Sequence, residues 1–161
     1  MKRLLILAII AAAGWLAWKS HRDAQGPEVI DHPVYAEMRV TTILENRAFE
    51  FALFIRSSDV DDCRTRARRS WEKTLAACAT CRFTEPTCQE KLPPRYARLF
   101  DDVPIPSTYL SATRGTRGER DGRLVVYGLT DQEGEFVCEQ MKSKILENYQ
   151  GTAHCVRASG G

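Results

Sequence analysis

The sequence predicts an α+β domain built on an antiparallel sheet. Three observations support this class: some segments alternate apolar and polar residues as strands do, two others carry apolar residues at helical spacing, and neighbouring strands follow one another across short polar turns. With 43% hydrophobic and 27% charged residues in 161, the composition is that of an ordinary globular protein. The length leaves room for one domain after a targeting segment.

The first 18 residues are predicted to form an N-terminal hydrophobic helix that anchors the chain in a membrane. Lys2 and Arg3 precede an uncharged run over residues 4–18, which is typical of an export signal. The small residues 11–13 would allow cleavage, but the apolar run continues beyond them. We therefore expect an uncleaved anchor, with a cleaved signal peptide as the alternative. The anchoring side chains are expected to include Leu4, Leu5, Ile6, Trp15 and Trp18.

The charge distribution predicts the orientation of the chain and the class of its partners. The positive-inside rule places the N-terminus in the cytoplasm and the domain in the periplasm or outside the cell. Residues 19–33 form a polar linker, and residues 34–161 form the domain. Without Lys2 and Arg3, the 23 basic residues become 21, equal to the 21 acidic ones. A neutral domain argues against a nucleic-acid partner.

The first elements of the domain are two strands and a helix. Residues 38–44 are rich in β-branched side chains and residues 48–55 alternate, so the turn at 45–47 joins a strand pair. The apolar face of the second strand is expected to comprise Phe49, Phe51, Leu53 and Ile55. Residues 57–59 then open a helix with the apolar stripe Cys63, Ala67, Trp71, Leu75 and Cys78.

A proline-punctuated segment separates this unit from the next hairpin. Residues 82–87 are predicted to form a short strand. Residues 92–106 hold too many prolines for regular structure, yet enough apolar side chains to pack against the domain. Residues 108–113 and 123–129 are then expected to pair across a polar, glycine-bearing turn.

The second helix has the clearest start signal in the chain. Thr130 and Glu133 have the spacing of a capping box, in which each side chain satisfies a free backbone donor. Gly151 suits a helix end that requires positive φ. Residues 152–157 are expected to form a closing strand.

The order of elements from residue 48 to residue 157 is β-α-β, an irregular insert and β-β-α-β, with an extra strand in front. This order resembles the ferredoxin-like split βαβ sandwich, an antiparallel sheet with two helices on one face. The resemblance implies a fold and no function, because unrelated activities share it.

Six cysteines behind an export segment indicate a disulfide framework. The helix that follows Cys138 climbs about 16 Å and the closing strand returns about 13 Å, so Cys155 ends level with Cys138. We expect these two residues to form a bridge.

Helix and strand lengths also favour a pairing for the other four cysteines. A helix from Cys63 to Cys78 and a strand from Cys81 to Cys88 bring Cys63 level with Cys88 and leave Cys78 with Cys81. If the helix ends near residue 74, Cys63–Cys81 with Cys78–Cys88 is the rival pairing.

Cys78 and Cys81 form a CxxC motif, the one motif here that suits chemistry. At the C-terminus of a helix the dipole opposes a thiolate, so we interpret the pair as structural. A thiol-disulfide oxidoreductase that uses this pair is the alternative. A zinc site of four thiolates would normally need two tight pairs, and only one is present. No metal or cofactor is therefore expected.

The expected function is a non-enzymatic binding or assembly module for another protein or a cell-surface polymer. The proline-rich insert interrupts an otherwise regular domain, which is typical of a functional segment. Its exposed side chains are the candidate contacts: Tyr96, Phe100, Tyr109, Arg95 and Arg98.

Overall fold

A computed structural model describes residues 26–27, 29–78 and 80–159 of the chain. The predicted anchor lies outside the described residues, as does most of the predicted linker. Among the described residues, no helix is both long and apolar enough to cross a membrane. The elements, in chain order, are β1 (Val34–Leu44), β2 (Arg47–Ser57), α2 (Val60–Ala77), β3 (Arg82–Gln89), α3 (Pro94–Ala97), the 3-10 helix η1 (Arg98–Asp101), β4 (Tyr109–Thr113), β5 (Gly122–Tyr127), α4 (Asp131–Leu146) and β6 (Thr152–Val156).

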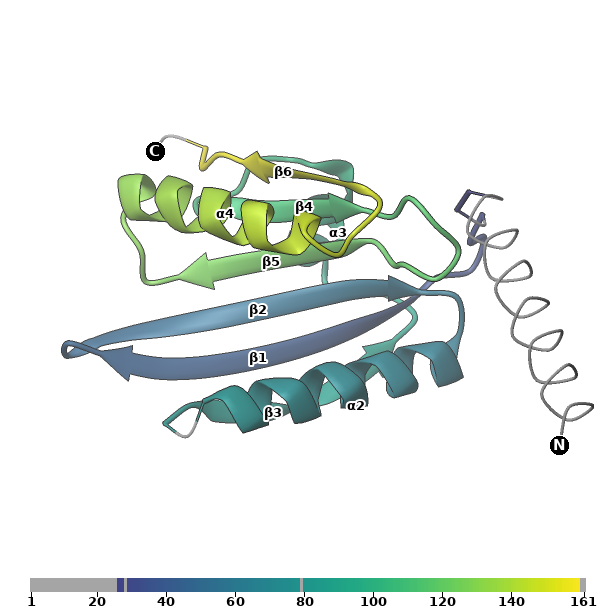
Figure 1. The fold of residues 1–161 in the computed structure, drawn as a ribbon, viewed down its shortest axis with the longest axis horizontal. Helices are drawn as coiled ribbons and strands as arrows, with labels where there is room; N and C mark the ends of the chain where they lie inside the picture. The colour runs from purple at the N-terminus through teal and green to yellow at the C-terminus, as the bar shows by residue number, and fades with distance from the viewer. Residues whose placement is uncertain (1–25, 28, 79, 160–161) are drawn as a thin grey trace, which may run out of the picture.

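The six strands form one antiparallel sheet in the order β3-β1-β2-β5-β4-β6, which confirms the predicted α+β class (Figure 1). The chain builds this sheet from two ββαβ halves, β1-β2-α2-β3 and β4-β5-α4-β6. In each half the first strand lies between the second and the third. The halves meet where β2 pairs with β5 in the middle of the sheet.

The ferredoxin-like arrangement is not confirmed by this strand order. Both helices do belong to split βαβ units, because β1 separates β2 from β3 and β4 separates β5 from β6. In a ferredoxin-like sheet two such units interleave, and each fills the gap in the other. Here the strand just before each unit fills its gap. The tight turn at Glu45 and Asn46, both with positive φ, makes β1 the local partner of β2.

Both long helices pack on the same face of the sheet, each over the outer strands of its own half (Figure 1). α2 buries Cys63 and Ala67 against Val34, Ala36 and Met38 of β1. The cap residue Asp59 starts α2 by accepting a hydrogen bond from the Asp62 N–H at 2.8 Å.

The proline-rich segment covers the opposite face and builds the larger core. This core comprises Ala52, Phe54, Leu92, Tyr96, Leu99, Tyr109, Val125 and Val156. Ala52 and Phe54 have no exposed surface, whereas the predicted apolar residues of β2, including Phe51 and Leu53, face the helices and are half-buried. The more deeply buried face of β2 is therefore the one that sequence alternation did not select.

Three disulfides pair all six cysteines, and they are the pairs favoured by element lengths. Cys63–Cys88 and Cys138–Cys155 each join a helix to the strand that returns beside it. Cys78–Cys81 closes the end of α2. The first two bridges occupy equivalent places in the two ββαβ halves.

The start of α4 is as predicted, but the role of Gly151 is not. Thr130 and Glu133 form the capping box. α4 ends at Leu146, and Gly151 does not have positive φ. A Cβ at Gly151 would lie 1.9 Å from the Thr113 carbonyl oxygen, so glycine is required by close backbone approach.

Candidate functional site

Three of the five predicted contact residues line one cavity. It encloses about 610 Å³ on the sheet face opposite α2 and α4. We call it the arginine–tyrosine pocket, and its lining residues are Arg39, Glu50, Arg95, Tyr96, Arg98, Ile105, Pro106, Ser107 and Tyr127.

The other two predicted contact residues lie elsewhere. Tyr109 has no exposed surface, and its hydroxyl donates to the Val103 carbonyl at 3.0 Å. The prediction that Tyr109 is a contact residue is therefore wrong. Phe100 is half-buried, with its ring centroid 5.2 Å from that of Tyr35 and 4.8 Å from the Arg56 guanidinium. Its ring is used in packing and does not line the pocket.

Arg39 is the most highly connected side chain of the pocket. Its Nε donates to Glu37 at 2.7 Å, its Nη1 to Glu50, and its Nη2 to the Tyr96 hydroxyl at 2.6 Å. Burial lowers the pKa of the Arg39 guanidinium, but these three hydrogen bonds outweigh burial and hold the pKa above its ordinary value. Arg39 is therefore charged and fixed in orientation.

The rim of the pocket carries two exposed arginines from consecutive short helices. Pro94 starts α3 at a position where its missing N–H costs nothing, and η1 follows at Arg98. Arg95 lies with its guanidinium 4.4 Å from the centre of the Tyr96 ring. No carboxylate of the described residues forms an ion pair with Arg95 or Arg98. These two charges are available to a ligand.

Tyr127 completes the wall with a neutral phenol. Burial, followed by the neighbouring Tyr96, raises the pKa of the Tyr127 hydroxyl. The hydroxyl therefore keeps its proton at neutral pH and can donate a hydrogen bond. The pocket thus combines fixed and free guanidinium groups with phenol rings, the side-chain types enriched at binding hot spots.

Arg123 holds the proline-rich segment against the sheet and so positions the rim. Its side chain is nearly buried and donates to the carbonyls of Leu99 at 2.8 Å and Ala112 at 3.0 Å. It also forms an ion pair with Asp102 at 3.3 Å. Burial lowers the pKa of Arg123. The nearby carbonyl oxygens nevertheless satisfy its donors.

Asp102 brings a serine and a histidine together, but not as a nucleophile and its base. The Ser111 hydroxyl lies 2.7 Å from Asp102 Oδ1, and His154 Nε2 lies 3.3 Å from Asp102 Oδ2. A catalytic serine must hydrogen-bond to the histidine and must be open to substrate. Ser111 bonds to the aspartate instead and has no exposed surface. The arrangement stabilises the turn after η1, where Asp102 has positive φ.

The CxxC pair lies at the C-terminal end of α2, as the sequence predicted. Cys81 lines an apolar hollow with Met38, Trp71 and Phe83 among its walls. All four cysteines of the zinc alternative are in disulfides. Among the described residues, no cluster of three or more His, Cys, Asp or Glu side chains is placed to hold a metal ion.

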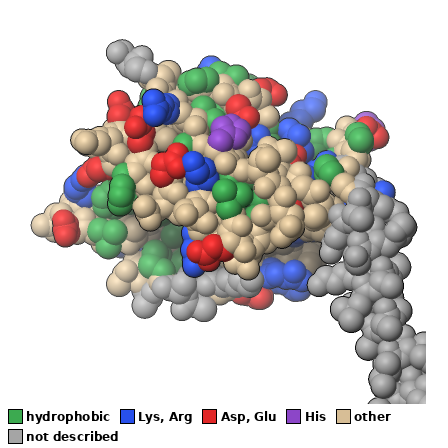
Figure 2. Space-filling model, turned by 45° about the horizontal axis from the view of Figure 1, so that its top comes forward, with side chains coloured by type: hydrophobic (Ala, Val, Ile, Leu, Met, Phe, Trp, Pro, Cys, Tyr) green, Lys and Arg blue, Asp and Glu red, His purple; other side chains and the backbone are tan. Residues whose placement is uncertain are grey.

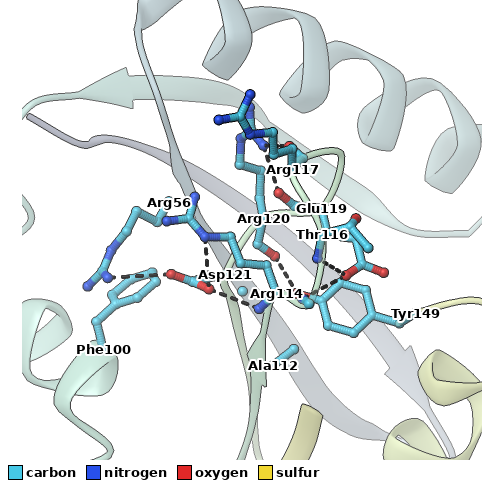
Figure 3. A network of polar contacts seen from close by, with 12 residues as sticks. Arg56, Phe100, Ala112, Arg114, Thr116, Arg117, Glu119, Arg120, Asp121 and Tyr149 are labelled. Atoms are coloured by element: carbon cyan, nitrogen blue, oxygen red, sulfur yellow. Dashed lines mark hydrogen bonds and ion pairs between the residues drawn. The ribbon is translucent and has the colours of Figure 1, made fainter. Parts of the chain in front are cut away.

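A polar network fixes the β4–β5 loop at one end of the sheet (Figure 3). Asp121 accepts from the Arg114 backbone N–H at 3.0 Å and from Arg56 at 3.4 Å. Tyr149, just beyond α4, donates to the Arg120 carbonyl at 2.8 Å. Burial, followed by Glu119, raises the pKa of the Tyr149 hydroxyl. This network determines the position of Arg120.

Sequence reasoning missed Arg39, Glu50 and Tyr127, which complete the pocket. Each lies on a strand and points away from the helices, so it looks like an ordinary outward-facing residue until the proline-rich segment is placed above it. The one available signal was Arg39 on one strand and Glu50 on its hairpin partner, opposite charges that the turn at residues 45–46 brings to the same face. No family model matches the chain, and no curated protein or solved structure is significantly similar to it.

Proposed function

We propose that this chain is a membrane-tethered, non-enzymatic binding or assembly module that captures an anionic protein or cell-surface polymer through the arginine–tyrosine pocket. The observation that carries the proposal is the pair Arg95 and Arg98, which line the pocket and form no ion pair with any carboxylate of the described residues. Below them, Arg39 and Tyr96 are already fixed by hydrogen bonds. Guanidinium groups bind carboxylates and phosphates through paired hydrogen bonds.

The tether and compartment belong to the same proposal. Residues 1–18 anchor the chain, and the domain faces the periplasm or the exterior of the cell. Three disulfides support an oxidising compartment, because cytosolic proteins seldom keep such bonds.

The charge balance of the chain supports a local contact and not a nucleic-acid partner, because without Lys2 and Arg3 it has 21 basic and 21 acidic residues. Acidic and basic side chains are interspersed on the face shown in Figure 2. A nucleic-acid binder presents instead a broad basic face. Attraction of an anionic partner would therefore depend on the few arginines that line the pocket.

The test is binding of the full chain, held in lipid nanodiscs, to immobilised poly-L-glutamate. The double variant Arg95→Ala, Arg98→Ala is expected to bind roughly tenfold more weakly than the unchanged chain. The control is Arg64→Ala, Arg82→Ala, which removes two exposed arginines outside the pocket. Equal losses in both variants would show unspecific attraction and reject the pocket as the site.

The second candidate is thiol-disulfide exchange at Cys78–Cys81, favoured by the apolar hollow beside Cys81. In that reaction a thiolate of a substrate dithiol attacks the Cys78–Cys81 disulfide, joins one of these cysteines and releases the other as a thiolate. The second substrate thiolate then attacks the mixed disulfide, so the substrate leaves with its own disulfide and the pair is left as two thiols. Cys78 is the C-terminal cap residue of α2, where the helix dipole disfavours a thiolate.

A redox titration of the pair separates the two candidates. A reduction potential below about −300 mV marks a structural bond and excludes the exchange reaction. A potential near those of known thiol-disulfide enzymes, about −120 to −270 mV, would favour the exchange reaction.

A further inference from the structure

The two long helices leave the middle of the sheet uncovered on their face. α2 packs mainly over β1 and β3, with fewer contacts to β2, and α4 packs over β4 and β6. The helix axes are therefore about four strand spacings, or ~19 Å, apart. Helices in direct contact lie about 8–10 Å apart. Among the described residues, no further helix or strand lies over the strip of β2 and β5 between α2 and α4 (Figure 1).

Two hollows along β2 follow this strip and meet at Leu53. One encloses about 330 Å³ and includes Phe51 and Leu53, and the other encloses about 370 Å³ and includes Leu53 and Ile55. Since these three residues share one face of the strand, the hollows form a single groove. We call it the α2–α4 groove.

One end of the α2–α4 groove is apolar. Trp71 of α2 and Phe83 of β3 form its wall, with ring centroids 5.2 Å apart. The remaining lining of this end is Met38, Val40, Phe51, Leu53, Cys81 and Leu124. The aromatic and β2 side chains here are only half-buried, so the groove exposes apolar surface to solvent.

The other end of the groove is basic. Arg66, Arg69 and Arg120 line it, and Arg66 and Arg120 share the single carboxylate of Asp62, at 2.7 and 2.6 Å. No carboxylate of the described residues pairs with Arg69. Glu119 also lines this end, but it accepts hydrogen bonds from backbone N–H groups of the loop and of Gln150 (Figure 3). The balance of the five charges is positive.

We propose that the α2–α4 groove binds a single-chain amphiphile with an anionic head, such as a fatty acid, with its chain along β2 and its head at Arg69. The apolar floor from Phe51 to Ile55 is about 14 Å long, and the volumes fall in the range of small-molecule pockets. An extended peptide is disfavoured, because β2 and β5 are hydrogen-bonded on both sides and offer no free backbone groups.

Trp71 provides a direct readout of this site. The chain has three tryptophans, so replacing Trp15 and Trp18 by Phe leaves Trp71 alone. The full chain in lipid nanodiscs is titrated with 12-bromododecanoate, whose terminal bromine quenches a tryptophan that it contacts. Saturable quenching of Trp71 is expected. The trimethylammonium compound with the same brominated chain is expected to bind at least threefold more weakly.

Matched variants separate groove binding from partition into the bilayer. Leu53→Gln, in the middle of the floor, is expected to weaken binding about tenfold, and Arg69→Glu to reverse the preference for the anionic head. Arg64→Glu, an exposed change on α2 outside the groove, is expected to leave both titrations unchanged.

Three outcomes would overturn the proposal. Quenching that does not saturate and is equal in Leu53→Gln would mean partition into the bilayer only. Equal affinity for the two head groups would remove the role of the basic end. A change in the oligomeric state of Leu53→Gln without a change in quenching would identify the strip as an interface between copies of the chain. Because the groove and the arginine–tyrosine pocket lie on opposite faces, either proposal can fail alone.

Discussion

Arg47 and Glu133 form a two-point ion pair between the two halves of the domain. Nη1 lies 2.7 Å from Oε1 and Nη2 lies 2.9 Å from Oε2, across 86 residues of sequence. The same Glu133 accepts from the Thr130 backbone N–H at 2.8 Å in the capping box of α4. One carboxylate thus links the start of β2 to the start of α4.

This pair predicts a specific loss of stability in acid. The hydrogen bond from Arg47, followed by those from Thr130, lowers the pKa of Glu133 to about 2. Because this is below the unfolded value of about 4.3, the contribution is present above pH 4.3 and is lost as the pH falls towards 2. Glu133→Gln is expected to flatten the stability profile in that window, as measured by urea unfolding at pH 7 and pH 3. Asp131→Asn, in the same helical turn, should leave the slope unchanged, and an equal flattening there would point to the helix dipole instead.

Each disulfide is expected to contribute to the free energy of unfolding according to the length of the loop that it closes. Cys63–Cys88 and Cys138–Cys155 span 25 and 17 residues, and Cys78–Cys81 spans 3. Replacing both cysteines by alanine should cost about 3 kcal/mol for either long loop and roughly half of that for the short one. The measurement is the free energy of unfolding of three double variants. Equal losses would contradict the loop-entropy explanation.

Gly151→Ala is expected to destabilise the β4–β6 edge. The new Cβ would lie 1.9 Å from the Thr113 carbonyl, so the backbone must move and the Thr113–Thr152 pairing with it. A cost of at least about 2 kcal/mol is expected in thermal or urea unfolding. Gly118→Ala is the control, since its nearest neighbour atom would be 3.8 Å away. A change within about 0.5 kcal/mol in both variants would show that the edge relaxes freely.

Arg123→Met is expected to loosen the proline-rich segment. It leaves the carbonyls of Leu99 and Ala112 without their buried donor, at a cost of about 3 kcal/mol. Arg117→Met, at an exposed position of the β4–β5 loop, should change stability by less than about 0.5 kcal/mol. Hydrogen exchange of residues 94–101 reports the effect directly. Unchanged protection there would mean that apolar packing alone holds the segment.

Local signals in the sequence were sufficient to predict most of the helices and strands. The capping box at Thr130, the alternation of residues 48–55 and the turn at residues 45–46 each act over a few neighbours, and all appear in the structure. The Cys138–Cys155 bridge follows from the same information, because a helix and its returning strand have known rises per residue. For the other four cysteines the element lengths favoured the observed pairs, but a rival pairing depended on where the first helix ends, and the structure places that end at Ala77.

The sheet order could not be obtained in this way. Either β1 or a strand of the other half could lie between β2 and β3. Which one does so depends on the relative stability of pairings between strands distant in sequence, and the sequence pattern is compatible with both. The same holds for Tyr109, which alternation places on a strand but only the packing of the proline-rich segment buries.

The sequence by itself determined the α+β class, the starts of the two long helices and the Cys138–Cys155 bridge, because these depend on local periodicity and chain geometry. It did not predict α3 and η1, the two short helices inside the proline-rich segment. Only the tertiary structure decided that the two ββαβ halves lie side by side. That arrangement places Arg39 and Glu50 beneath Arg95 and Arg98 and leaves β2 open between α2 and α4. The physical reason is that both sites are assembled from side chains of different elements, whose approach depends on the packing of the whole sheet.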